Sequence, residues 1–185
     1  MQTKALLLID IQNDYFPGGK MALPGSEAAG RQAVKLLADF REKGLPVVHV
    51  RHESRHSGAA FFEPDTDGAE IHASVASREG ETIVLKHFPS SFHETGLETI
   101  LRDMGITGLV AAGMMSNMCV DSTVRSAFYL GFQCIVAHDA CAAAPLEFNG
   151  QAVPADIVHT AFMASLGMVH ARVLSTGEIL RSEIS

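Results

Sequence analysis

Cysteine is scarce in this sequence, and its number does not suit a disulfide framework. Three cysteines occur, at Cys119, Cys134 and Cys141. The odd number and the close spacing argue against a set of disulfide bridges. Because free thiols suit a reducing compartment, we expect a cytoplasmic protein.

Long apolar runs and clusters of basic residues are also missing. The apolar run near the N-terminus is interrupted by Asp10, so it is too short for the core of a signal peptide. Nothing approaches the ~18 consecutive apolar residues of a membrane span. The formal net charge is -7, whereas proteins that neutralise phosphates normally carry a basic patch. We therefore expect neither a membrane nor a nucleic acid as a partner.

What is present suits one globular domain over residues 1–185. Hydrophobic residues make up 47% of the chain and charged residues 19%, which is typical of a protein with a packed core. The length of 185 residues provides enough chain for a sizeable core but leaves little for a second full domain.

Short apolar runs alternate with helical patterns along the chain. Strands are predicted at 5–9, 46–50, 83–85, 109–112, 134–137 and 169–174, and helices at 26–43, 97–104, 118–130 and 154–166. Wholly apolar strands that alternate with helices indicate a parallel sheet with both faces covered. We predict an α/β fold in three layers, with a six-stranded, mostly parallel sheet and helices on both faces. The exception is 51–82, where a long stretch without periodicity is typical of a binding loop or lid.

Chemically active residues follow three of the predicted strands. Asp10 ends the first strand, Lys86 ends the third, and Cys119 lies just beyond the fourth. Ligands of open parallel sheets bind beyond the carboxyl ends of the strands. A carboxylate, an amine and a thiol are therefore predicted to meet at one edge of the sheet.

Each of these residues also has a structural interpretation, which the sequence alone leaves open. Cys119 lies near the start of a predicted helix, where the helix dipole favours a thiolate, but a free cysteine is commonly a small core residue. Asp10 could accept the thiol proton or be a solvated turn residue. Lys86 could hold that carboxylate or simply reach solvent. Cys134 is expected to be structural, and Cys141 too, although Cys141 could approach the same edge.

Three segments together resemble the isochorismatase-like cysteine hydrolases. They are LLLIDIQNDYF at 6–16, VLKHFPSSF at 84–92 and GMMSNMCVDSTVRSAFYLGF at 113–132. The resemblance implies a parallel sheet covered by helices, with Asp10, Lys86 and Cys119 as the catalytic residues. It also implies an oxyanion hole formed by the backbone amides of Met115 and Cys119, and a cis peptide bond between Met114 and Met115.

The resemblance also suggests residues that contact the substrate. Tyr15 takes the place of an aromatic residue that lines the pocket in relatives, and Gln12 lies in the same motif, where it could instead fix the loop. His52 is the histidine of the long loop expected near the pocket, and Phe92 is expected in the pocket wall. His52, His56 and His72 do not match the spacing of the metal-binding nicotinamidase branch, so neither a metal nor another cofactor is expected.

The leading hypothesis is a cysteine hydrolase that cleaves a C–N bond in a small amide, carbamoyl or ureido compound through a thioester. An isochorismatase-type hydrolase of a vinyl ether is the alternative enzyme. That reaction needs an acid more than a nucleophile, so the presence of Cys119 counts against it. A non-catalytic redox-sensing or interaction protein with the same fold is the third interpretation. The apolar segment 148–168 further predicts a homo-oligomer, a dimer or larger.

Overall fold

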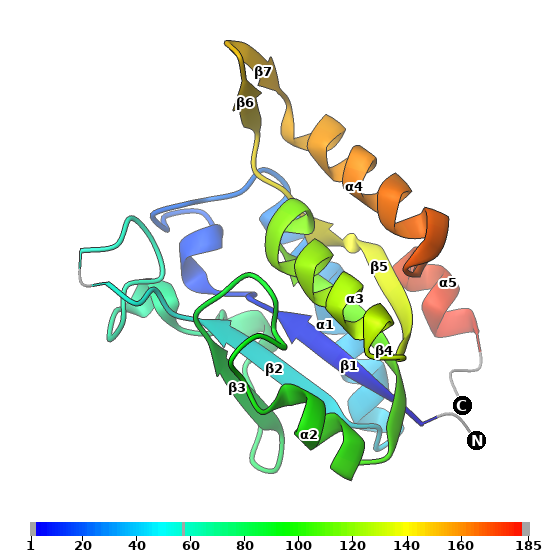
Figure 1. Ribbon diagram of the computed structural model, residues 1–185. Coiled ribbons are helices and arrows are strands. Elements are labelled where there is room, and N and C mark those ends of the chain that lie inside the picture. The colour runs from blue at the N-terminus through cyan, green and yellow to red at the C-terminus, as the bar shows by residue number, and fades with distance from the viewer. Residues whose placement is uncertain (1–2, 57, 183–185) are drawn as a thin grey trace.

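A single twisted sheet forms the middle layer of the protein in a computed structural model (Figure 1). The structure describes residues 3–56 and 58–182, so the two ends of the predicted domain 1–185 lie outside it. The order of the strands is β3-β2-β1-β4-β5-β8, and all neighbouring pairs are parallel. The strands are β1 (Thr3–Ile9), β2 (Val47–His52), β3 (Thr82–Lys86), β4 (Ile106–Met114), β5 (Gln133–Ala142) and β8 (Arg172–Leu174).

Helices cover both faces of the sheet, which confirms the predicted three layers. They are α1 (Ser26–Glu42), α2 (Leu97–Asp103), α3 (Asp121–Tyr129), α4 (Ala155–Val169) and α5 (Thr176–Arg181). Alternate residues of β1 point to opposite faces: Leu6 and Leu8 pack in the core beneath α1 and α5, whereas Leu7 and Ile9 pack beneath α2, α3 and α4. The uninterrupted apolar sequence of β1 indicates a strand that is buried on both faces, and the structure agrees.

Several boundaries differ from the sequence-based prediction. The last strand was expected at 169–174, but α4 continues to Val169 and leaves only Arg172–Leu174 for β8. The helix expected from Met118 is preceded by a one-turn π-helix over Ser116–Val120, and α3 begins at Asp121. A hairpin of β6 (Leu146–Phe148) and β7 (Gln151–Val153) was not predicted and extends away from the sheet (Figure 1).

The long segment between β2 and β3 is packed onto the protein. Short 3₁₀ turns at Asp67–Ala69 and Ala73–Val75 interrupt it, and the side chains of Phe62 and Val75 are buried. The Asp14 carboxylate accepts hydrogen bonds from the backbone N–H groups of Lys20 and Phe62. The segment is therefore tied to the end of β1, where the candidate site lies.

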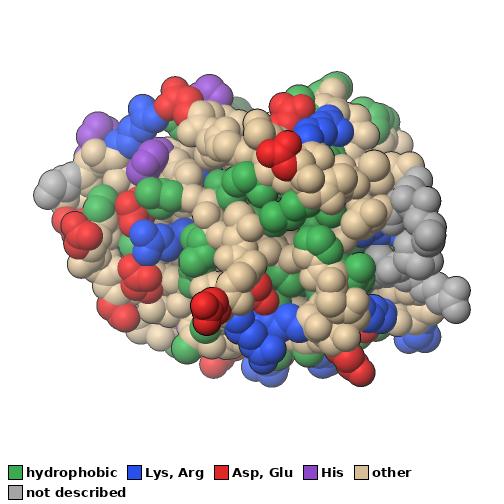
Figure 2. Space-filling model, turned by 90° about the horizontal axis from the view of Figure 1, so that it is seen from below, with side chains coloured by type: hydrophobic (Ala, Val, Ile, Leu, Met, Phe, Trp, Pro, Cys, Tyr) green, Lys and Arg blue, Asp and Glu red, His purple; other side chains and the backbone are tan. Residues whose placement is uncertain are grey.

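The molecular surface mixes charges of both signs. On the face in Figure 2, Lys and Arg lie beside Asp and Glu around the rim, and hydrophobic side chains gather nearer the middle. Within the described residues, each helix is too short or too polar to traverse a bilayer.

Candidate active site

The predicted carboxylate, amine and thiol do meet at the carboxyl edge of the sheet. Asp10 follows β1, Lys86 ends β3, and Cys119 lies in the π-helical turn after β4. The Lys86 Nζ atom is 2.7 Å from Asp10 Oδ2, and both side chains are buried. The Asp10 carboxylate and the Cys119 sulfur belong to a group of ligand atoms that all lie within 4.8 Å of one another. Three distant parts of the sequence thus form one cluster.

Close packing of β1 against β4 sets the position of Asp10. Ile9 pairs with Gly113, whose φ is +138°. A side chain at Gly113 would collide with the backbone of Ile9, so only glycine fits there. Asp10 itself has φ 49°, a left-handed conformation that is uncommon for a residue other than glycine. The chain therefore turns sharply at Asp10, immediately beyond the sheet.

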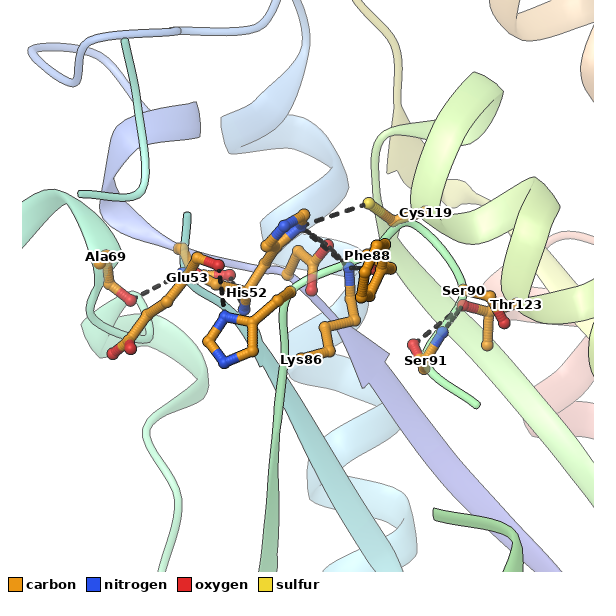
Figure 3. A network of polar contacts seen from close by, with 12 residues as sticks. His52, Glu53, Ala69, Lys86, Phe88, Ser90, Ser91, Cys119 and Thr123 are labelled. Atoms are coloured by element: carbon orange, nitrogen blue, oxygen red, sulfur yellow. Dashed lines mark hydrogen bonds and ion pairs between the residues drawn. The ribbon is translucent and has the colours of Figure 1, made fainter. Parts of the chain in front are cut away.

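His52 is the third strand-terminal residue that points into the cluster. It ends β2, and its Nδ1 atom lies 3.1 Å from Lys86 Nζ, 3.8 Å from Cys119 Sγ and 3.7 Å from Asp10 Oδ2 (Figure 3). An ammonium group can only donate, so the contact with Lys86 assigns the acceptor lone pair to Nδ1 and the ring proton to Nε2. The structure places His52 beside the cluster, but at the end of β2 and not in the long loop where it was predicted. The contact of His52 with substrate stays a prediction.

Gln12 lies behind His52 and holds its backbone in place. The Gln12 Nε2 amide donates to the carbonyls of His52 and Ala69, and Gln12 Oε1 accepts from the His52 N–H at 2.8 Å. The Gln12 side chain is fully buried. This arrangement supports the loop-fixing interpretation of Gln12 over the predicted contact with substrate.

Tyr15 and Phe92 have different environments. Tyr15 is buried against Phe62, with ring centroids 4.7 Å apart. Phe62 also lies beside His52, so Tyr15 is one ring away from the cluster. Burial raises the pKa of the Tyr15 phenol well above 10, and the Asp10 carboxylate adds to this effect. Phe92 instead packs against Phe132 and lines a surface hollow of about 660 Å³ along α3. Asp10, Lys86 and Cys119 are not among the described residues that line that hollow, and the contact of Phe92 with substrate stays a prediction.

The charge state of the cluster follows from the competition between burial and pairing. Burial raises the pKa of Asp10, but its neighbours, the Lys86 ammonium first among them, outweigh this effect, so the pKa of Asp10 lies below its ordinary value. Burial lowers the pKa of Lys86, and the Asp10 carboxylate more than compensates, so the Lys86 pKa is raised. At neutral pH the pair is therefore ionised.

Cys119 differs from the expectation based on the helix dipole. The thiol was predicted to have a lowered pKa, but burial and the Asp10 carboxylate raise the pKa of Cys119 well above its ordinary value, against the opposing effect of Lys86. The side chain is 4% exposed, which explains why desolvation dominates. The resting cysteine is consequently a thiol, and its proton must leave as the sulfur attacks.

A metal ion fits this cluster poorly. Asp10, His52 and Cys119 offer carboxylate, imidazole and sulfur ligands within 4.8 Å of one another, a donor set that suits zinc. The Lys86 ammonium, however, contacts both the Asp10 carboxylate and the lone pair of His52. A divalent cation would have to displace that ammonium, so no step of the chemistry is assigned to a metal.

The turn between β4 and α3 carries the predicted oxyanion hole. A cis peptide bond joins Met114 and Met115, as the family resemblance implied. The Met115 carbonyl accepts hydrogen bonds from the N–H groups of Met118 and Val120, which closes the turn around Cys119. The role of the Met115 and Cys119 amides as oxyanion donors stays a prediction.

Two further contacts at the site were missed by sequence reasoning. The Ser116 hydroxyl lies 2.8 Å from Nδ1 of His159 on α4, and Ser91 hydrogen-bonds Thr123 of α3. Both pairs join residues more than 30 positions apart. His159 lies in an apolar-rich helical segment, where no local signal indicates that its side chain contacts the turn.

Comparisons with known proteins agree with this geometry. The family model described as the isochorismatase domain matches residues 4–163. The uncharacterized isochorismatase family protein YddQ of Bacillus subtilis is 51% identical over 179 residues, covering 97% of this chain and 99% of the relative. A crystal structure of an isochorismatase-family protein from Oleispira antarctica has 54% identity and a TM-score of 0.94, covering 97% of this chain and 96% of that chain.

A relative with a defined reaction is also similar. The maleamate amidohydrolase of Pseudomonas putida is 32% identical over 149 residues, covering 73% of this chain and 70% of the relative. The match of the family model to most of the chain, together with these identities, settles the family. The chain belongs to the isochorismatase family of hydrolases.

Proposed function

We propose that this protein is a cysteine hydrolase that cleaves a C–N bond in a small amide, carbamoyl or ureido compound. The observation that carries the proposal is the buried cluster of Asp10, Lys86 and Cys119 at the carboxyl edge of the sheet. The similarity to maleamate amidohydrolase supports an amide as the bond that is broken.

In the proposed first half-reaction, Asp10 takes the proton of Cys119 as the sulfur attacks the carbonyl carbon. The transfer neutralises the Asp10 carboxylate while negative charge develops on the sulfur and then on the substrate oxygen. The buried site, which includes the Lys86 ammonium, therefore holds one negative charge throughout. The amides of Met115 and Cys119 bind the oxyanion, and one such donor typically contributes about 3 kcal/mol to lowering the barrier. The tetrahedral intermediate then breaks its C–N bond, Asp10 gives its proton to the leaving nitrogen, and a thioester remains.

In the second half-reaction, a water molecule replaces the leaving amine. Asp10, again ionised, accepts a proton from this water as its oxygen attacks the thioester carbonyl. Collapse of the second intermediate breaks the C–S bond and returns the proton to Cys119. His52 accepts from Lys86 through Nδ1, which leaves its Nε2–H as the hydrogen-bond donor of the ring.

A panel of small substrates tests the proposal. Purified protein is incubated with maleamate, nicotinamide, ureidoacrylate, N-carbamoylsarcosine, oxamate and isochorismate, and released ammonia and pyruvate are measured. We expect ammonia from at least one amide or ureido compound, and a loss of nearly all turnover in a Cys119→Ser variant. Pyruvate from isochorismate without ammonia from any amide would favour the vinyl-ether alternative. Rapid oxidation of Cys119 without turnover of any compound would favour the redox-sensing alternative.

We also propose that the protein self-associates through α4. An exposed stripe runs along this helix at Ile157, Ala161, Ala164 and Met168, and Asp156 is the one charged residue of the helix. Ile157 and Met168 are 54% and 83% exposed. Two copies of a chain with net charge -7 repel least through an uncharged face, and the alanines let two such helices approach closely.

Sedimentation equilibrium of a variant in this stripe tests the interface. We expect the wild type to sediment as a dimer or larger assembly, and Ala161→Glu to sediment as a monomer because the new carboxylate would be buried unpaired. Ala28→Glu, on the exposed side of α1, is the matched control and should keep the wild-type mass. A monomeric wild type, or an unaffected Ala161→Glu variant, would contradict the proposed interface.

A further inference from the structure

The turn that carries Cys119 is braced by a residue far away in the sequence. Ser116 opens the π-helical turn, one residue after Met115 and three before Cys119. Its side chain is fully buried, and its hydroxyl oxygen lies 2.8 Å from Nδ1 of His159. Among the described residues, His159 is the hydrogen-bond partner of this hydroxyl. The contact therefore connects the turn over Ser116–Val120, called the nucleophile turn below, to α4.

Both partners of this contact belong to elements that pack in the protein. His159 lies within α4 beside Val158, which is buried, and α4 is anchored to the sheet through Met163 and Leu166. The turn over Ser116–Val120 is closed on the Met115 carbonyl and continues into α3 at Asp121. The hydrogen bond from His159 restrains this turn at its first residue, directly after Met115. The backbone amides of the turn are the donors predicted to bind the oxyanion.

We infer that His159 is a positioning residue that fixes the nucleophile turn through its Nδ1 hydrogen bond to Ser116. The kinetic tests of this inference rest on the proposed function, whereas the alkylation test does not. Loss of the bond leaves the Ser116 hydroxyl buried and unpaired, and the turn relaxes to seek another partner. A displacement of well under 1 Å at the reacting atoms is enough to slow an enzyme, and about 100-fold is typical of 1 Å.

A pair of amide substitutions separates this role from a general contribution to packing. The side-chain amide of asparagine places a polar atom where histidine has Nδ1, whereas that of glutamine places one where histidine has Nε2. His159→Asn therefore keeps a partner for Ser116 and His159→Gln does not. We expect His159→Gln and Ser116→Ala each to lower kcat by about 10- to 100-fold with KM within about threefold of wild type. His159→Asn should stay within about threefold of wild-type kcat.

A double variant tests whether the two residues act as one unit. Because both single changes remove the same hydrogen bond, Ser116→Ala combined with His159→Gln should be no slower than the slower single variant. Losses that multiply in the double variant would overturn the inference, and so would wild-type kcat in His159→Gln. Equal losses in His159→Asn and His159→Gln would likewise show that Nδ1 is not the atom that matters.

Alkylation of Cys119 provides a readout that needs no substrate. The rate of modification by iodoacetamide, located by peptide mass mapping, reports on the position of the sulfur in the turn. We expect this rate to differ at least about threefold from wild type in His159→Gln and Ser116→Ala, and to match wild type in His159→Asn. If the rates follow this pattern but no compound is turned over, the brace exists and the proposed hydrolysis fails. Unchanged alkylation in His159→Gln and Ser116→Ala would overturn the brace itself.

Discussion

Cys119→Ser is expected to lower kcat/KM by at least about 10³-fold on any amide that the protein hydrolyses. Burial and the Asp10 carboxylate already raise the pKa of the Cys119 thiol, and a hydroxyl in the same place would be far harder to deprotonate. The thioester route would then be closed, and the oxyanion donors alone would leave a small residual rate. Steady-state release of ammonia from wild type and variant measures the loss directly.

An acid-quenched reaction analysed by intact mass gives a second readout. Wild-type protein should carry an acyl adduct on Cys119 during turnover, and the Cys119→Ser protein should not. Cys134→Ser is the matched control, because Cys134 is also buried and its thiol donates to the carbonyls of Val124 and Phe132, to which a serine hydroxyl can also donate. Full turnover by Cys119→Ser, or an adduct on Cys134, would contradict covalent catalysis by Cys119.

The sequence predicts the position of this cysteine correctly but the direction of its pKa shift wrongly. Placing Asp10, Lys86 and Cys119 at one edge of the sheet required only that three apolar runs be parallel strands, and the structure has them so. The thiol pKa was predicted from the helix dipole, a local effect. Burial opposes that effect, and burial depends on the packing of segments far apart in the sequence.

Other parts of the site were hidden from the sequence for a similar reason. Gln12 could be either a substrate contact or a loop clamp, and only the position of its amide beside His52 and Ala69 favours the clamp. The contact of Ser116 with His159 depends on how α4 packs across the turn. The helix α5, by contrast, is indicated by its local sequence although it was not predicted. Ser175 and Glu178 form a capping box at its N-terminus.

Lys86→Met is the second change with a large expected effect, a loss of about 10²- to 10⁴-fold in kcat/KM at neutral pH. The Lys86 ammonium keeps the pKa of Asp10 below its ordinary value of 3.8, although burial raises it. Without Lys86, burial is unopposed and the pKa of Asp10 rises. A protonated Asp10 cannot accept the thiol proton, so the residual activity should increase as pH rises. The acidic limb of the pH profile of kcat/KM should therefore move to higher pH in the variant.

Stability should change with pH in the same sense. In wild type, the lowered pKa of Asp10 contributes stability above pH 3.8, and this contribution is lost as the pH falls through the folded-state pKa. In Lys86→Met the folded-state pKa is raised, so the variant loses stability as the pH rises above that of the unfolded carboxyl. The difference between the two proteins in urea unfolding should thus be smallest in acid and reach about 3–5 kcal/mol near neutral pH, the usual cost of breaking a buried pair.

A double variant distinguishes loss of the proton acceptor from simple unfolding. Asp10→Asn combined with Lys86→Met removes both buried charges, so it should recover most of the stability that Lys86→Met loses, while its activity stays at the lowest level. Lys35→Met, at an exposed lysine of α1, is the control for removing a positive charge and should behave as wild type. An acidic limb that stayed in place in Lys86→Met would contradict this account in one of two ways. Either Asp10 stays ionised without the ammonium, or a group other than Asp10 accepts the thiol proton, and His52, with Nδ1 3.8 Å from the sulfur, is in position to do so.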